Sequence, residues 1–263
     1  MTTVGFIGTG NMGSALARAA AKAQDTKIYL YDKDEAKALA LAKDLSADVA
    51  TLDGVSGCDV IFLAVKPNVI KDVAAEIKSK IKSGSVLVSM AAGVSLGALS
   101  LVLGTAPVIR IMPNTPAACG SGMMLYARNE SVTDAMAETF LKVMEPSGEL
   151  DELPENLIDA ASALSGCGPA FVYMFIEALA DGAVACGLPR DKALTYAIET
   201  VKGSAEMVKA TGEHPEALKD KVCSPGGSTI AGTHELEVGG FRACAQNAVI
   251  AAYKKTLTLG KSE

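Results

Sequence analysis

The chain has 263 residues, 49% hydrophobic and 21% charged, a balance typical of a globular protein with a sizeable core. Its net charge is -6, and no basic patch indicates nucleic acid as a partner. The 6 cysteines and 2 histidines form no pair at metal-ligand spacing, so we expect free thiols and no metal. We see no targeting segment and no uninterrupted apolar run of about 18 residues. A cytoplasmic protein outside the membrane is therefore expected.

The first half of the chain alternates strand-like and helix-like segments. Strands are expected at residues 3–8, 27–32, 59–65, 85–90, 107–112 and 122–127. Helices are expected at 11–24, 34–44, 68–80, 95–103 and 131–144. This alternation is typical of βαβ units, so it predicts an α/β fold with a Rossmann-type, doubly wound and mainly parallel sheet.

The second half shows helical patterns only. Helices are expected at 155–164, 169–186, 189–210, 213–221, 229–237 and 240–259. We therefore predict a Rossmann-type domain at 1–152 and an all-α domain at 153–263. The helix at 169–186 is apolar on nearly every face and must be buried all round. A homodimer built on this domain is the expected solution, and a well-packed monomeric bundle is the alternative.

A glycine loop joins the first strand to the first helix. It reads Gly8, Thr9, Gly10, Asn11, Met12 and Gly13, which fits Gly-x-Gly-x-x-Gly. The first glycine suits a tight turn, the second lets the backbone approach a pyrophosphate, and the third lets the helix lie close to the strand. The loop predicts a dinucleotide site, the alternative being a turn that only packs.

Asp32 ends the second expected strand, 19 residues after Gly13. An acidic residue at this place usually accepts a hydrogen bond from the adenosine ribose 2′-hydroxyl, and it would repel a 2′-phosphate. Lys33 follows directly and could offset that repulsion. The residues alone favour NADH or the use of both cofactors, and a solvated aspartate is the alternative.

Three further segments follow the carboxyl ends of strands, where ligands lie in open α/β sheets. They comprise Ala64, Val65, Lys66 and Pro67; Ala91, Ala92 and Gly93; and residues 112–116. Each alone reads as a turn, but together they predict a groove for the nicotinamide half of a cofactor.

A second polar loop, residues 224–229, precedes a helix of the second half. Its hydroxyls, glycines and helix amides favour a small carboxylate, although an ordinary helix cap is the alternative. We find no lysine or histidine placed to protonate an alkoxide. This scarcity favours reduction of a protonated imine, whose positive charge disappears as hydride arrives.

These motifs together resemble the pyrroline-5-carboxylate reductase family over essentially the whole chain. The resemblance rests on FIGTGNMG, AVKP, AAGV, RIMPNTP, LSGCGPAF and, most specifically, VCSPGGSTIAGTHELE. It implies a Rossmann domain followed by a helical domain that interlocks in a homodimer, often assembled further into a decamer. It implies hydride transfer from NADPH or NADH to the cyclic imine, giving L-proline in the last step of proline biosynthesis.

The resemblance also implies roles for individual residues. The loop from Gly8 to Gly13 and Asp32 would hold the adenosine half of the cofactor, and Ala64–Pro67 and Ala91–Gly93 the nicotinamide half. Thr229 would hydrogen-bond the ring nitrogen of the substrate. Ser224, Gly227 and Ser228 would hold its carboxylate. Glu155 would favour the protonated imine, while stabilisation of a helix dipole is its alternative role.

Some positions depart from the family pattern. Many relatives have a neutral residue in place of Asp32, Cys167 stands where a serine is usual, and Lys221 where an asparagine is common. We expect oxidation of Cys167 or Cys223 to slow turnover. A β-hydroxyacid dehydrogenase is one rival, but its lysine beyond Gly-x-Gly is absent after Gly168. A non-catalytic NAD(P) sensor is the other.

Overall fold

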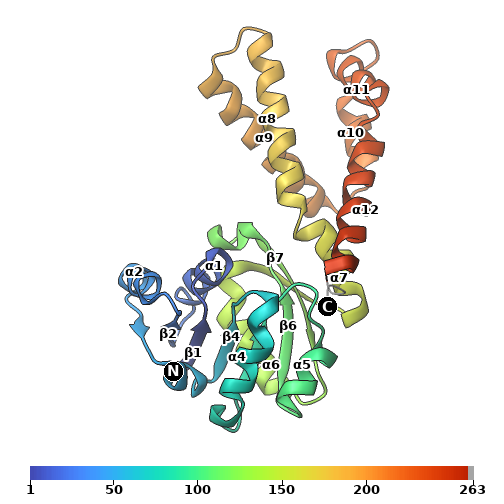
Figure 1. Ribbon diagram of the computed structural model, residues 1–263. Helices are drawn as coiled ribbons and strands as arrows, with labels where there is room; N and C mark the ends of the chain where they lie inside the picture. The colour runs from blue at the N-terminus through green and yellow to red at the C-terminus, as the bar shows by residue number, and fades with distance from the viewer. Residues whose placement is uncertain (260–263) are drawn as a thin grey trace. The chain divides into compact units, whose positions relative to one another are not determined.

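The computed structural model describes residues 1–259, which form two compact units (Figure 1). Unit 1 contains Met1–Cys167 and the end of the last helix from Ala252, and unit 2 contains Gly168–Ala251. The helix Glu155–Ser165 therefore belongs with the first unit by its contacts. The domain boundary expected after residue 152 stays a prediction.

Unit 1 is built on a sheet of eight strands in the order β3-β2-β1-β4-β5-β6-β7-β8. The strands are β1 (Thr2–Ile7), β2 (Thr26–Tyr31), β3 (Asp48–Val49), β4 (Val60–Leu63), β5 (Val86–Ser89), β6 (Val108–Met112), β7 (Gly122–Arg128) and β8 (Gly148–Glu152). Strands β1 to β6 are parallel, β7 is antiparallel to β6, and β8 is parallel to β7. Because β1 lies between β2 and β4, the strand order reverses there, as in a Rossmann fold. The predicted fold class is confirmed.

Helices cover both faces of this sheet. They are α1 (Asn11–Ala20), α2 (Glu35–Leu45), α3 (Leu52–Ser56), α4 (Ile70–Ile77), α5 (Leu96–Leu103), α6 (Asp134–Met144) and α7 (Glu155–Ser165), with short 3-10 helices at Pro67–Val69, Lys78–Lys80, Thr115–Cys119 and Glu145–Ser147. Side chains along β4 alternate between the faces. Phe62 stacks on Phe6 of β1 in the core beneath α1, α2 and α6, while Ile61 and Leu63 pack with α3, α4, α5 and α7. Burial on both faces explains why these strands are continuous apolar runs.

Unit 2 is helical. It contains α8 (Gly168–Ala185), α9 (Arg190–Thr211), α10 (Pro215–Val222), α11 (Ser228–Val238) and most of α12 (Phe241–Leu259). Its core within one described chain is small and is centred on Ala180, Ala193 and Ala197. Large apolar side chains of α8 stay exposed, with Tyr173 at 57% and Met174 at 70%. Such contiguous apolar surface indicates an interaction face.

One segment of the described chain, Glu155–Ala185, is long and apolar enough to cross a membrane by length and composition alone. Two charged residues, Glu177 and Asp181, interrupt its apolar character within α8. The segment spans two helices, α7 and α8, and α7 packs on the sheet through the fully buried side chain of Ile158. Cover by a protein partner accounts for the exposed part equally well.

Candidate functional site

The glycine loop lies at the carboxyl end of β1, where the strand order reverses. Gly8 has φ +103° and donates its N–H to the carbonyl of Tyr31 at 2.7 Å. A Cβ on Gly8 would lie 2.4 Å from the carbonyl oxygen of Ala64, and one on Gly13 would lie 2.4 Å from the carbonyl oxygen of Gly8. Close backbone packing therefore requires glycine at both positions.

Gly10 has a different environment. It is the N-cap of α1, and a Cβ placed on it would meet no atom within 4 Å. Because glycine has no side chain to accept the first amides of the helix, and the first turn carries no acidic residue, this helix end keeps its positive character. The space and the donors fit a pyrophosphate group.

Asp32 and Thr9 form a tight hydrogen-bonded pair. The N–H and Oγ1 of Thr9 both donate to Oδ2 of Asp32, at 2.7 and 2.9 Å, and the N–H of Asp34 donates to Oδ1 at 2.9 Å. Burial raises the pKa of Asp32, but the hydrogen bonds from Thr9 and Asp34 outweigh it and leave the pKa below its usual value. The carboxylate is therefore charged at neutral pH.

A cavity of about 350 Å³ opens beside this loop. It brings together three regions that the sequence assigned to the cofactor: the glycine loop, the end of β2 and the end of β4. Its walls are Ile7, Gly8, Gly10, Tyr31, Asp32, Lys33, Ala64, Val65, Lys66, Val69 and Val73. The cavity is not lined by the remaining residues assigned to these regions, which are Thr9 of the loop, Asn11, Met12 and Gly13 at the start of α1, and Pro67 at the start of a 3-10 helix.

Ala91, Ala92 and Gly93 follow β5, next to the end of β4. The strands place them there, since Leu63 of β4 pairs with Ser89 of β5. Ala91 is buried in the core and Gly93 has φ +74°. They are neighbours of the cavity wall by sheet register, although they do not line the cavity itself.

The second polar loop lies in unit 2 and begins α11. The N–H of Gly227 donates to the carbonyl of Ser224 at 3.0 Å, closing a tight turn, and Gly227 is the N-cap of the helix. Ser224, Ser228 and Thr229 are exposed. Their hydroxyls have no hydrogen-bond partner within the described residues, so they remain free for a ligand.

A second cavity, of about 500 Å³, lies against this turn within unit 2. Its walls are Lys219, Gly226, Gly227, Ile230, Ala231, Thr233, His234 and Glu237. Gly226 and Gly227 are the residues it shares with the loop. Cys223, half-buried, precedes the turn as a free thiol.

Glu155 is engaged within unit 1. Its Oε1 accepts the N–H of Leu96 at the start of α5, at 2.7 Å, and a hydrogen bond from Arg110 at 3.2 Å. Arg110 also donates to Asp159 at 2.6 Å and is only 4% exposed in its side chain. These contacts tie α7 to α5 and β6, which is a structural role different from the helix-dipole stabilisation considered for Glu155.

Sequence reasoning missed Arg110, and it placed Asn114 in the predicted groove at residues 112–116 without a structural role. Arg110 lies within the apolar run of β6, and an isolated charge in such a run was the available signal. Asn114 follows the same strand, donates to the carbonyl of Ser165 at 3.0 Å and accepts the N–H of Met123 at 3.0 Å. Together they hold both ends of α7.

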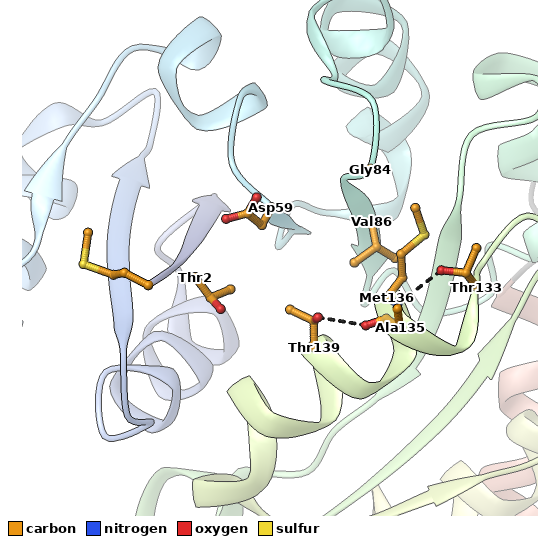
Figure 2. Close-up of a pocket in the computed structure, with 9 residues that line it drawn as sticks. Thr2, Asp59, Gly84, Val86, Thr133, Ala135, Met136 and Thr139 are labelled. Carbon is orange, nitrogen blue, oxygen red and sulfur yellow. Dashed lines mark hydrogen bonds between the residues drawn. The ribbon is translucent and has the colours of Figure 1, made fainter.

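A further cavity, of about 400 Å³, lies at the opposite, amino edge of the strands (Figure 2). Thr2, Asp59, Val86 and Thr139 line it, and it contains none of the predicted site residues. Asp59 is already paired with Lys82 and accepts two hydrogen bonds from Thr3. Because this acidic lining residue is already engaged, we assign no ligand to this cavity. Nowhere in residues 1–259 do three or more histidine, cysteine or acidic residues gather in a way that could hold a metal ion.

The fold and the glycine loop define the class of a nicotinamide-dinucleotide-dependent oxidoreductase. Residues 3–93 match the family model described as NADP oxidoreductase, coenzyme F420-dependent. Residues 155–259 match the model described as pyrroline-5-carboxylate reductase dimerisation. The first match lies in the first half of the chain and the second in the helical half, in the order that the sequence predicted.

Individual relatives agree over nearly the full length. The chain is 41% identical to a pyrroline-5-carboxylate reductase of Arabidopsis thaliana, covering 98% of this chain and 96% of the relative. It is also 41% identical to that of Escherichia coli, covering 98% of each. The crystal structure of Plasmodium falciparum pyrroline carboxylate reductase with NADP bound superposes with a TM-score of 0.88 at 35% identity, covering 98% of both chains. The chain belongs to the pyrroline-5-carboxylate reductase family.

Proposed function

We propose that this protein reduces the C=N bond of pyrroline-5-carboxylate with a hydride from NADPH or NADH, giving L-proline in the last step of proline biosynthesis. One observation carries the proposal. A single chain of this family combines a glycine loop open to a pyrophosphate with a Ser224–Thr229 turn whose three hydroxyls have no partner in the described chain.

The cofactor is held in unit 1. The first-turn amides of α1 beyond Gly10 would bind the pyrophosphate, and Asp32, in the wall of the cavity that Gly10 lines, would accept a hydrogen bond from the adenosine ribose. Ala64–Pro67 and Ala91–Gly93, at the ends of β4 and β5, would hold the nicotinamide half. The bound cofactor supplies the hydride.

The substrate carboxylate is held by the turn in unit 2. The hydroxyls of Ser224 and Ser228 donate to it, and the amino end of α11 favours its negative charge. The N–H of Gly227 already donates to the carbonyl of Ser224, so Gly227 shapes the turn instead of binding the carboxylate itself. Thr229 accepts a hydrogen bond from the protonated ring nitrogen. Hydride transfer turns a cationic imine into a neutral amine, so this chain needs orientation of the ring rather than an oxyanion stabiliser.

Glu155 has a supporting role in this proposal. Since its Oε1 already accepts from Leu96 and Arg110, we assign it to positioning α5 and α7 rather than to the imine proton. Glu155→Gln should then lower stability while kcat changes little. A large loss of kcat in a stably folded variant would restore the catalytic role.

We also place the enzyme in the cytoplasm, without a membrane or nucleic-acid partner. The exposed apolar faces of unit 2 are covered by a second copy of the chain, as the match to a dimerisation model supports. Further assembly of dimers into a decamer is part of the proposal.

The test is turnover of purified protein with pyrroline-5-carboxylate and either NADPH or NADH, followed by loss of nicotinamide absorbance and by formation of proline. Oxidation of one cofactor per proline is expected. Tight cofactor binding with no turnover on either cofactor would instead identify a non-catalytic sensor.

A further inference from the structure

The N–H, the hydroxyl and the carbonyl of Thr9 all form hydrogen bonds within the protein. Its N–H and Oγ1 donate to Asp32, and its carbonyl accepts from the hydroxyl of Ser14 at 2.7 Å. The residue is 6% exposed. A loop amide that is committed in this way is not free to bind a phosphate, so Thr9 does not have the direct binding role that the loop motif predicted for it.

The same contacts limit what Asp32 can do. A carboxylate offers about four acceptor positions on its two oxygens. Thr9 occupies two of them at Oδ2, and the N–H of Asp34 occupies one at Oδ1. One position therefore remains, on Oδ1, and Asp32 lines the cavity beside the glycine loop.

We propose that Thr9 and Asp32 form a latch that fixes the glycine loop before the cofactor binds, with Thr9 as a positioning residue and Asp32 left to accept a single ribose hydroxyl. The latch joins the end of β2 to the turn after β1, which the N–H of Gly8 already ties to Tyr31. The free amides at the start of α1 are thereby held in place for the pyrophosphate.

This inference rests on the proposed cofactor site and deepens it. Because the latch orders the loop for either cofactor, its loss should weaken NADH and NADPH binding equally. The charge of Asp32, by contrast, acts on the 2′ position, where the two cofactors differ. Loss of the latch should therefore leave the ratio of the NADH and NADPH affinities unchanged, whereas loss of the Asp32 charge should change that ratio.

The experiment measures the Kd of NADH and of NADPH by calorimetry on the full-length protein without any imine. Thr9→Val keeps the shape and the N–H but removes the hydroxyl. It should weaken both cofactors by the same factor of about 10, the size of one hydrogen bond to a charged group. Thr9→Ser restores the hydroxyl and should recover both values to within about twofold. Asp32→Asn should shift the ratio of affinities towards NADPH.

Several results would overturn the latch: unchanged Kd values in Thr9→Val, a change for one cofactor only, or Thr9→Ser as weak as Thr9→Val. If Thr9→Val does not fold, Ser14→Ala removes the hydroxyl that holds the carbonyl of Thr9 and should weaken both cofactors in the same proportion. Since cofactor binding alone is measured, a protein that fails to reduce the imine can still confirm or refute the latch.

Discussion

Gly10 and Gly13 belong to one loop, yet their surroundings assign them different tasks. Gly13→Ala would drive a Cβ to 2.4 Å from the carbonyl oxygen of Gly8 and should cost about 1–3 kcal/mol of stability through overpacking. Gly10→Ala meets no atom within 4 Å and should cost less stability than Gly13→Ala, only the weaker helix capping of alanine, while it weakens the binding of the cofactor, whose pyrophosphate needs that space. Urea unfolding of both variants, with cofactor titrations, measures the contrast. Equal destabilisation by both changes would contradict it.

Thr229 and Thr233 provide a matched pair on α11. The hydroxyl of Thr229 has no partner in the described chain, whereas that of Thr233 donates to the carbonyl of Ile230 at 3.0 Å. Thr229→Ala should lower kcat/KM for the imine about tenfold or more, the loss of one substrate hydrogen bond, with the Kd of the cofactor unchanged. Thr233→Ala serves as the control and should keep kcat/KM. An unaltered kcat/KM in Thr229→Ala would remove this residue from the substrate site.

At the scale of elements, Arg110 joins β6 to α7. Its side chain is 4% exposed and is paired with Glu155 and Asp159, while its Nε is buried without a hydrogen-bond partner among residues 1–259. Asp159→Asn should destabilise the protein by about 2 kcal/mol, because it withdraws a charged acceptor from a buried guanidinium. The exposed pair Arg18–Asp44 gives the control, and Asp44→Asn should change stability by less than about 0.5 kcal/mol. Chemical denaturation measures the loss of unfolding free energy in each variant. Equal losses would show that the burial of Arg110 does not strengthen its ion pair with Asp159.

Asp59 links the start of β4 to β1 by accepting the N–H and Oγ1 of Thr3. Burial raises its pKa, but hydrogen bonds from Lys82 and Thr3 prevail and lower it to about 2. A lowered folded pKa means stability that is fully present above the unfolded value, about 3.9, and is lost as pH falls towards 2. The unfolding midpoints of the wild type and Asp59→Asn should therefore differ most above about pH 4 and converge near pH 2. A constant difference across this window would contradict the assignment.

The elements that sequence reasoning predicted share one property: their burial repeats along the chain. Strands β1, β4, β5 and β6 are buried on both faces and read as apolar runs. Strand β3 has two residues, and β8 reads GELDE with charges on an outer strand, so neither has a recognisable pattern. The pairing of Thr9 with Asp32 depends on how β1 and β2 align, and that of Arg110 with Glu155 on contacts 45 residues apart. Neither the alignment of β1 with β2 nor a contact over 45 residues can be predicted from the pattern of neighbouring residues.

At the scale of the whole molecule, unit 2 leaves many apolar side chains uncovered in one chain, which makes association a condition of stability. Met174, 70% exposed on α8, should tolerate no charge in the assembled protein. Met174→Asp should dissociate the oligomer or lower its Tm at low protein concentration. Leu101, 88% exposed on α5 of unit 1, is the control, and Leu101→Asp should keep the wild-type mass. Analytical ultracentrifugation over a dilution series measures the mass of each variant. An unchanged mass for Met174→Asp would exclude the Met174 face of α8 from the interface.

The reversal of direction at β7 determines where the polypeptide leaves unit 1. After an ordinary parallel strand, the next helix runs back to the amino edge of the sheet. Strands β7 and β8 run antiparallel to the others, so α7 instead runs towards the edge formed by the carboxyl ends of β1 to β6. There the side chain of Asn114 donates a hydrogen bond to the carbonyl of Ser165 at the end of α7. Cys167, the residue at which the chain leaves unit 1, therefore lies at the same edge of the sheet as the glycine loop. In an all-parallel sheet α7 would end at the amino edge, and a further long segment would be needed to bring the chain back to the carboxyl edge. The reversed direction of β7 and β8 makes that segment unnecessary.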